Sequence, residues 1–209
     1  MRHTCPRCGG LVLESDDGTA TWRCARHGEV SPLRQLNGMS PEVLDNLVRT
    51  AKVPVLLPWP LPDGWVVTGL ASAGDEREGA AACVVALTGP NPVGGLGEML
   101  VVSEEIGVGL GAYCAGLDGP DPGGGFARCA PAAHVGLTHH EFPLWHVDAP
   151  GRAAFAGELL GGWLWLVLWP DTAGTLLVES MPLRDLREDG HPFALPFGAP
   201  SPRLPGEAG

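Results

Sequence analysis

The sequence predicts an α+β protein, in which a small N-terminal zinc ribbon precedes a mainly antiparallel β-sheet domain with one or two helices. Residues 1–34 carry cysteines and a histidine at the spacing of a zinc ribbon. Residues 163–169 are all apolar, as in a strand that is buried on both faces. The 31 glycines and 21 prolines among 209 residues favour long loops and few helices.

The metal motif has the pattern C-x2-C-x15-C-x2-H, formed by Cys5, Cys8, Cys24 and His27. Zinc takes four sulfur or nitrogen ligands in a tetrahedron, and each of the two tight turns supplies two of them. Because all four ligands come from the protein, no position remains open for water or substrate. The sequence therefore predicts one structural Zn²⁺.

Two short strands, 11–14 and 19–23, are predicted between the paired ligands, with a turn at Asp16-Asp17-Gly18. This hairpin brings the two ligand pairs together. Gly9 and Gly28 follow the two pairs, where a left-handed residue lets backbone N–H groups point at the sulfurs. A segment of this size has little core of its own, so metal binding is expected to supply its folding energy.

A linker over 31–38 is expected to lead into a helix that begins after Ser40, an N-cap residue, with Pro41 at its first position. The apolar residues recur at helical spacing, and Pro54 ends the helix. We expect this helix to cover one face of the sheet.

Prolines dominate residues 54–62 and exclude a helix there. The segment is expected to enter the sheet in extended form and to continue as a strand over 65–71. Trp59 and Leu61 are either part of the core edge or an exposed anchor for a partner, because prolines order the chain beside them.

Further strands are predicted over 80–87 and 98–103. Residues 107–112 match the G-x-G-x-x-A dinucleotide fingerprint, which requires a helix directly after it. We reject a dinucleotide site, because Gly116 and the turn residues 119–123 leave no room for a helix and no acid lies at a strand end about 20 residues further on.

Residues 113–148 collect most of the other side chains that could carry chemistry: Cys114, Asp118, Asp121, Cys129, His134, His139, His140, Glu141, His146 and Asp148. A catalytic metal site or a cysteine–histidine pair could be drawn from them. No pair has the H-x3-H spacing of a helical metal site. The sequence alone leaves open whether the four histidines converge on a pocket.

The C-terminal third begins with a strand predicted over 143–147 and a short helix over 148–160, with Phe155 and Leu159 facing inward. Strand 163–169 is expected to form a hairpin with 175–181 through a turn at 170–174. A helical turn is predicted over 182–189.

The predicted domain organisation has three parts. The ribbon covers residues 1–34, the α+β domain 35–195, and a disordered tail 196–209, because the tail is rich in proline and glycine.

The formal net charge is −11, which argues against general nucleic-acid binding, since that depends on neutralising phosphates. The N-terminal residues lack the apolar core of a signal peptide, and no apolar run reaches the ~20 residues that span a bilayer. We therefore expect a cytoplasmic protein that acts away from membranes and whose partner is a protein or a small ligand rather than nucleic acid.

Several stretches also resemble a family of uncharacterised actinobacterial proteins that is known only as a domain of unknown function. The resemblance rests on Cys5–Gly10 with Cys24–Gly28, Pro58–Pro62 with Gly64-Trp65, Gly107–Ala112, and Trp163–Trp165 with Trp169-Pro170. It spans nearly the whole chain. It implies an N-terminal zinc ribbon but no activity and no catalytic residue.

The leading functional prediction is a non-enzymatic binding or regulatory protein. One alternative is a small-molecule enzyme with a pocket lined by residues 107–148, where His146, Asp118 or Glu98 would converge. A second alternative is a DNA-binding regulator that uses the ribbon, and it requires a continuous arginine face.

Overall fold

The structure is a computed structural model, and it describes residues 3–15, 21–75, 77–188 and 194–205. Its N-terminal part is a small antiparallel sheet in the order β1-β2-β3. The three strands are β1 (Val12–Glu14), β2 (Trp22–Cys24) and β3 (Gly28–Glu29). We call residues 3–30 the ribbon. The predicted turn at 16–18 lies outside the described residues.

The rest of the chain is organised by a sheet of ten strands, which we call the main sheet. In sheet order the strands are β4 (Leu33–Gln35), β6 (Val66–Asp75), β7 (Gly79–Pro90), β8 (Leu96–Glu104), β12 (Gly162–Trp169), β11 (Ala153–Leu159), β10 (His140–Val147), β9 (Ala133–Leu137), β13 (Met181–Asp185) and β5 (Leu56–Pro58). Neighbours are antiparallel, except that β13 runs parallel to β9. This confirms the predicted α+β class with a mainly antiparallel sheet.

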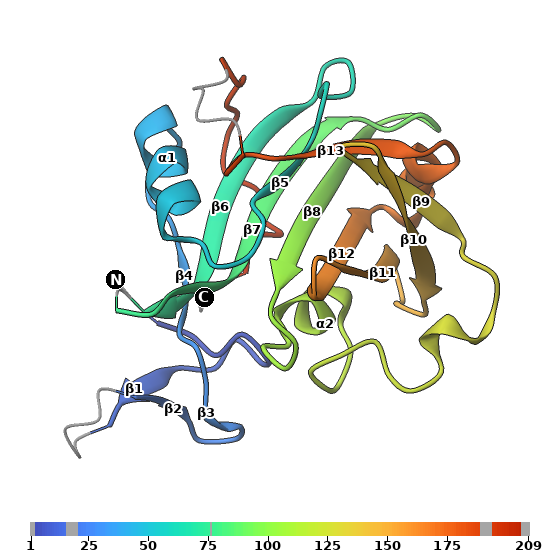
Figure 1. The fold of residues 1–209 in the computed structure, drawn as a ribbon. Helices are drawn as coiled ribbons and strands as arrows, with labels where there is room; N and C mark the ends of the chain where they lie inside the picture. The colour runs from blue at the N-terminus through green and yellow to red at the C-terminus, as the bar shows by residue number, and fades with distance from the viewer. Residues whose placement is uncertain (1–2, 16–20, 76, 189–193, 206–209) are drawn as a thin grey trace.

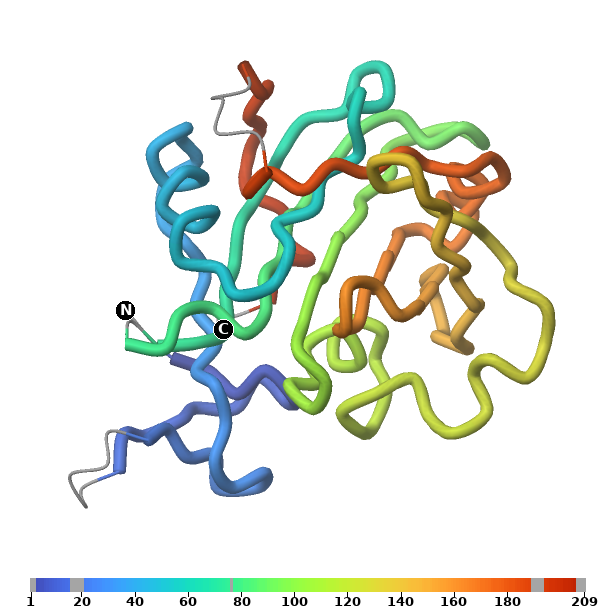
Figure 2. The backbone as a smooth tube through the Cα atoms, in the orientation of Figure 1, coloured from blue at the N-terminus to red at the C-terminus, as the bar shows by residue number. Residues whose placement is uncertain are grey.

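The strands curl around an interior, and the ribbon is set off at the lower left of the view, below α1 (Figures 1 and 2). Four helices complete the described structure: α1 (Pro41–Thr50), α2 (Leu110–Ala115), and the 3₁₀ helices η1 (Phe126–Arg128) and η2 (Asp171–Leu177). None of the helices in the described ranges is long and apolar enough to cross a membrane.

Strand β12 lies between β8 and β11 and confirms the predicted central strand that is buried on both faces. Its leucines, Leu164, Leu166 and Leu168, belong to one core cluster. Its other side carries Trp163, Trp165, Val167 and Trp169, which belong to a second cluster. The alternation follows from the two-residue period of a strand.

Different segments cover the two faces of the main sheet. Residues from α1, β5, β9 and β13 pack into the first cluster. Residues from α2 join the second cluster, with Phe126 and Leu204 packed against it. Helix α1 begins where the sequence predicts: the Ser40 side chain accepts a hydrogen bond from the Val43 N–H at 3.4 Å, and Leu44 and Leu47 are buried.

Three local predictions for the C-terminal third are wrong. The predicted hairpin between strands 163–169 and 175–181 does not form, because residues 171–177 form η2. The next strand, β13, pairs with β5 and β9 instead of β12. Residues 153–159, predicted as helix, form β11, although Phe155 and Leu159 are buried as expected. Residues 182–185, predicted as a helical turn, belong to β13. In each case the new pairing satisfies backbone groups of the main sheet.

The sequence predicts a disordered tail from residue 196, but residues 196–205 pack along β6. The Val67 N–H donates to the Pro196 carbonyl at 2.9 Å, and the Ser201 N–H donates to the Thr68 carbonyl at 2.9 Å. A Cβ on Gly69 would lie 2.7 Å from Leu204 Cδ2, so the absence of a side chain at Gly69 lets Leu204 of the tail pack against β6. At the other end, Leu33 and Arg34 belong to β4 of the main sheet, although the predicted ribbon extends to residue 34.

Candidate metal centre

Four side chains at one end of the ribbon bring their ligand atoms together. The sulfurs of Cys5, Cys8 and Cys24 and a ring nitrogen of His27 all lie within 4.8 Å of one another. Cys8 Sγ and Cys24 Sγ are 3.8 Å apart, and Cys5 Sγ and His27 Nδ1 are 3.4 Å apart. A tetrahedron with Zn–S bonds of ~2.3 Å has S–S edges of about 3.8 Å. The residue types and spacing therefore fit a four-coordinate metal ion.

The backbone around the ligands has the geometry that the sequence predicts. Gly9 and Gly28 both have positive φ, 67° and 70°. The Gly9 N–H donates to the Cys5 carbonyl at 2.8 Å, which closes the first turn. The Arg26 N–H points at Cys24 Sγ, 3.4 Å away. Such N–H contacts stabilise a thiolate, which is the form that binds metal.

The cysteines differ in how easily they lose a proton. Burial raises the pKa of the Cys5 thiol to about 12. Burial is also the largest single influence on Cys24, but the backbone N–H groups of Arg26 and His27 and hydrogen bonds from Cys5 and Cys8 together outweigh it and lower the pKa of that thiol. A buried thiolate at Cys5 needs a nearby positive charge, and a coordinated metal ion supplies one.

The first ligand turn also contacts α2 and the loop between β8 and α2. The Arg7 guanidinium donates from Nε to the Val108 carbonyl at 3.2 Å and from Nη2 to the Gly107 carbonyl. Gly9 lies against Tyr113 of α2, where an added Cβ would meet the phenol oxygen at 2.4 Å. Two of the four candidate ligands, Cys5 and Cys8, therefore lie on the same turn as the contacts that fix the ribbon in place.

The loop with the dinucleotide pattern does lead into a helix, α2, contrary to our expectation that turn residues exclude one. The helix has only six residues. Its first N–H groups already have a partner: the Glu104 carboxylate accepts from the Leu110 N–H at 2.6 Å and from the Gly111 N–H at 3.2 Å. A phosphate would have to displace this buried carboxylate, so the rejection of a dinucleotide site has a further physical reason.

Glu104 is 1% exposed. Burial raises the pKa of its carboxyl to about 7, although the N–H groups of Leu110 and Gly111 act in the opposite direction. The sequence gives no signal for this residue, because Glu104 looks like an ordinary polar residue at a strand end.

The side chains singled out between 113 and 148 do not form a second centre. His134, His139, His140 and His146 are all exposed, and they lie on or beside β9 and β10. Cys114 is buried in α2, whereas Cys129 is exposed. Asp118, Asp121, Glu141 and Asp148 are also exposed. Among the described residues, only the group formed by Cys5, Cys8, Cys24 and His27 could hold a metal ion.

The predicted anchor at Trp59 and Leu61 is only partly available. Both side chains are half-buried and pack against the first core cluster. The Trp59 N–H donates to the Pro182 carbonyl at 2.9 Å, which attaches the segment to β13. These contacts favour the alternative in which the segment is the edge of the core.

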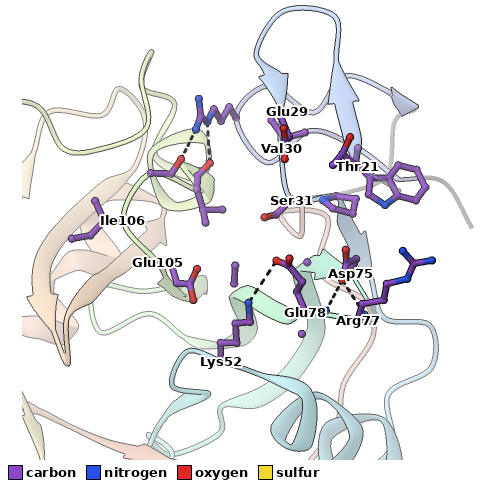
Figure 3. Close-up of a pocket in the computed structure, with 18 residues that line it drawn as sticks. Thr21, Glu29, Val30, Ser31, Lys52, Asp75, Arg77, Glu78, Glu105 and Ile106 are labelled. Atoms are coloured by element: carbon purple, nitrogen blue, oxygen red, sulfur yellow. Dashed lines mark hydrogen bonds and ion pairs between the residues drawn. The ribbon is translucent and has the colours of Figure 1, made fainter. Parts of the chain in front are cut away.

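A cleft of about 510 Å³ lies between the ribbon and the main sheet (Figure 3). Ribbon residues Arg7, Trp22 and Glu29 line it, together with residues that flank β6, β7 and β8, such as Asp75 and Glu105. Sequence reasoning missed this cleft because its walls come from positions as far apart as 7 and 108. None of the four histidines lines it.

Comparison with known proteins gives one family. The sequence pattern of a family described as "Family of unknown function (DUF6758)" matches residues 1–204. No curated protein and no solved structure matches the chain. The family match covers both the ribbon and the main sheet.

Proposed function

We propose that this chain, which belongs to the family of unknown function DUF6758, is a non-enzymatic binding or regulatory protein with a structural Zn²⁺. The metal is held by Cys5, Cys8, Cys24 and His27. Its role is to fix the ribbon against the main sheet, so that the two together present a binding surface.

The observation that carries this proposal is the group of four candidate ligand atoms, two of them on the turn that anchors the ribbon. A tetrahedral ion bound by all four would have no position left for a reacting water. Arg7 lies between the first two ligands in sequence and bonds to the loop before α2. Loss of metal would therefore release one wall of the cleft as well as the ribbon fold.

The two alternatives have less support. An enzyme with a site in 107–148 would need convergent groups, and the four histidines there are exposed on the surface. A DNA-binding ribbon would need a continuous arginine face, but Arg7 is bonded to carbonyls of the loop before α2, and the net charge is −11. We therefore propose a protein or small-ligand partner rather than nucleic acid. The proposed setting is the cytoplasm of an actinobacterium, from the resemblance and from a composition with Lys52 as the sole lysine.

Metal analysis followed by Co²⁺ substitution tests the structural role. We expect one zinc per chain in the purified protein. Co²⁺ in its place should show the visible absorption of a tetrahedral site with thiolate ligands, and added azide should leave that spectrum unchanged, because no coordination position is open. A spectrum that shifts with azide would indicate an open, catalytic site. A protein purified without zinc that also fails to bind added Zn²⁺ or Co²⁺ would contradict the proposal altogether.

A further inference from the structure

The cleft between the ribbon and the main sheet has the size of a small-molecule site. Its volume of about 510 Å³ falls within the ~300–1,000 Å³ typical of ligand pockets. Figure 3 shows Glu29, Val30 and Ser31 on one side of the open space and Glu105, Lys52 and Glu78 across from them. The two sides come from different parts of the fold, as is common for binding sites between modules.

Charged groups of both signs line this cleft. Among the described residues that line it are four carboxylates, Glu29, Asp75, Glu78 and Glu105, and three cations, Arg7, Lys52 and Arg77. The described lining therefore has one more acidic than basic side chain. Most ligand pockets are lined mainly by apolar side chains. A lining with this much charge favours a polar ligand that carries charges of its own.

Some of these charges already have partners. Lys52 Nζ lies 3.8 Å from Glu78 Oε2, and Asp75 Oδ1 accepts from the backbone N–H groups of Arg77 and Glu78. Within the described ranges, the side chains of Glu29 and Glu105 have no ion pair and no hydrogen bond. These two carboxylates are therefore available to a cationic group.

Arg7 supplies the complementary charge. It donates to the carbonyls of Gly107 and Val108, which fixes the plane of its guanidinium. Neither partner is charged, so the positive charge is not neutralised by a carboxylate of the described chain. A guanidinium held in this way is suited to a ligand carboxylate, which it can contact with its remaining N–H groups.

Apolar surface lies next to these charges. Trp22 is half-buried, and its ring centroid lies 4.3 Å from that of His3. Ile106, 68% exposed, lines the cleft from the loop after β8. An aromatic ring beside carboxylates is a favourable surface for an ammonium group and its methylenes.

We propose that the cleft binds a small peptide-like zwitterion, with its ammonium groups at Glu29 and Glu105 and its carboxylate at Arg7. This inference rests on the proposed binding function and gives it a ligand class. The excess of one carboxylate among the described lining residues favours a ligand with one more positive than negative charge, such as a dipeptide with a lysine.

The test is isothermal titration calorimetry of the zinc-loaded full chain with the dipeptide lysyl-alanine. We expect measurable binding that weakens as salt is added, because the charges are solvent-accessible. Lysyl-alanine amide lacks the carboxylate and should bind about tenfold more weakly, since it loses its charged hydrogen bonds to Arg7. Glutamyl-alanine places a carboxylate at the acidic side and should give no measurable heat.

Matched protein variants test the acidic side. Glu29→Gln combined with Glu105→Gln should weaken lysyl-alanine binding about tenfold. Glu141→Gln, an exposed carboxylate on β10 outside the cleft, should leave the affinity unchanged. All three substituted positions are exposed, and an unchanged thermal unfolding midpoint checks that folding is intact.

Three results would each overturn the inference. The first is the absence of binding by lysyl-alanine. The second is equal affinity of the wild-type chain for the acid and the amide, and the third is equal affinity of the double variant and the wild-type chain for lysyl-alanine. Co²⁺ spectra of the same preparation separate the two proposals: a closed metal site with no dipeptide binding contradicts the ligand class alone.

Discussion

The ribbon and the main sheet are stabilised in different ways. The ribbon cluster contains three buried residues, and two of them, Cys5 and Cys24, are metal-ligand candidates. The main sheet has two extended clusters, one on each face, and its central strand β12 is buried on both sides. Apolar burial contributes roughly 25 cal/mol per Å², so the main sheet has a large favourable term that the ribbon lacks.

Under the proposed function, a metal ion at the four ligand positions has the role in the ribbon that apolar burial has in the main sheet. A structural zinc site supplies folding free energy directly, and the unfolded chain has no preformed site. Metal and burial also respond differently to pH and to substitution, so the comparison can be tested by changing one region at a time.

The largest expected effect comes from Cys24→Ser. Zinc binding is worth ~10–16 kcal/mol in comparable peptides, so loss of a ligand should unfold the ribbon. The main sheet should keep its cooperative thermal transition, which differential scanning calorimetry measures. Cys129→Ser, which removes an exposed cysteine outside the metal group, should change neither region. Loss of the cooperative transition in the Cys24 variant would show that ribbon and sheet fold as one unit.

The next effect concerns packing between α2 and β12. A Cβ added to Gly111 would lie 2.0 Å from Cδ1 of Trp165, a residue with no exposed surface. Gly111→Ala must therefore displace the helix or the ring, and we expect a loss of about 3 kcal/mol or more in unfolding free energy, measured by chemical denaturation. Metal content should stay at one zinc. Gly124→Ala, where no atom lies within 4 Å of the added carbon, is the matched control.

The smallest expected effect is a pH dependence of stability that comes from Glu104 in the main sheet. The pKa of Glu104 is raised from 4.5 to about 7, so the folded chain holds a proton that the unfolded chain releases between these values. The stability of the main sheet should then fall as pH rises through this range, by up to about 3 kcal/mol. Glu104→Gln should remove that part of the dependence. Glu158→Gln, an exposed carboxylate on β11, should keep it.

The ribbon should show the opposite dependence on pH. Protons compete with metal for cysteine and histidine ligands, so zinc is released as pH falls. A colorimetric chelator measures zinc release from the ribbon at each pH. Chemical denaturation measures the unfolding free energy of the main sheet at each pH. If zinc binding by the ribbon and the stability of the main sheet both decreased in the same direction of pH, the claim that the two regions are stabilised differently would be contradicted.

The sequence predicts local features well where one residue pattern has one physical meaning. The C-x2-C and C-x2-H pairs identify four side chains that converge as candidate metal ligands, and an unbroken apolar run identifies β12 as buried on both faces. Ser40 and Pro41 identify the start of α1. In these cases the constraint comes from neighbouring residues alone.

Predictions fail where a partner that is distant in the sequence determines the local structure. Phe155 and Leu159 are four residues apart, which fits an inward-facing helix as well as alternate positions of β11. The tail around Pro196 looks disordered by composition, yet β6 supplies its hydrogen-bond partners. The cleft is missed for the same reason, because Arg7 and Glu105 become neighbours only in the folded chain.

The most direct test of the account is hydrogen exchange, followed by mass spectrometry, on the wild-type chain before and after zinc is removed with a chelator. Structural metal predicts that amides of β1, β2 and β3 lose their protection, while those of β7, β8 and β12 keep it. Readdition of Zn²⁺ should restore the ribbon. Unchanged protection in the ribbon, or loss of protection across β7, β8 and β12, would contradict the claim that the metal stabilises the ribbon alone.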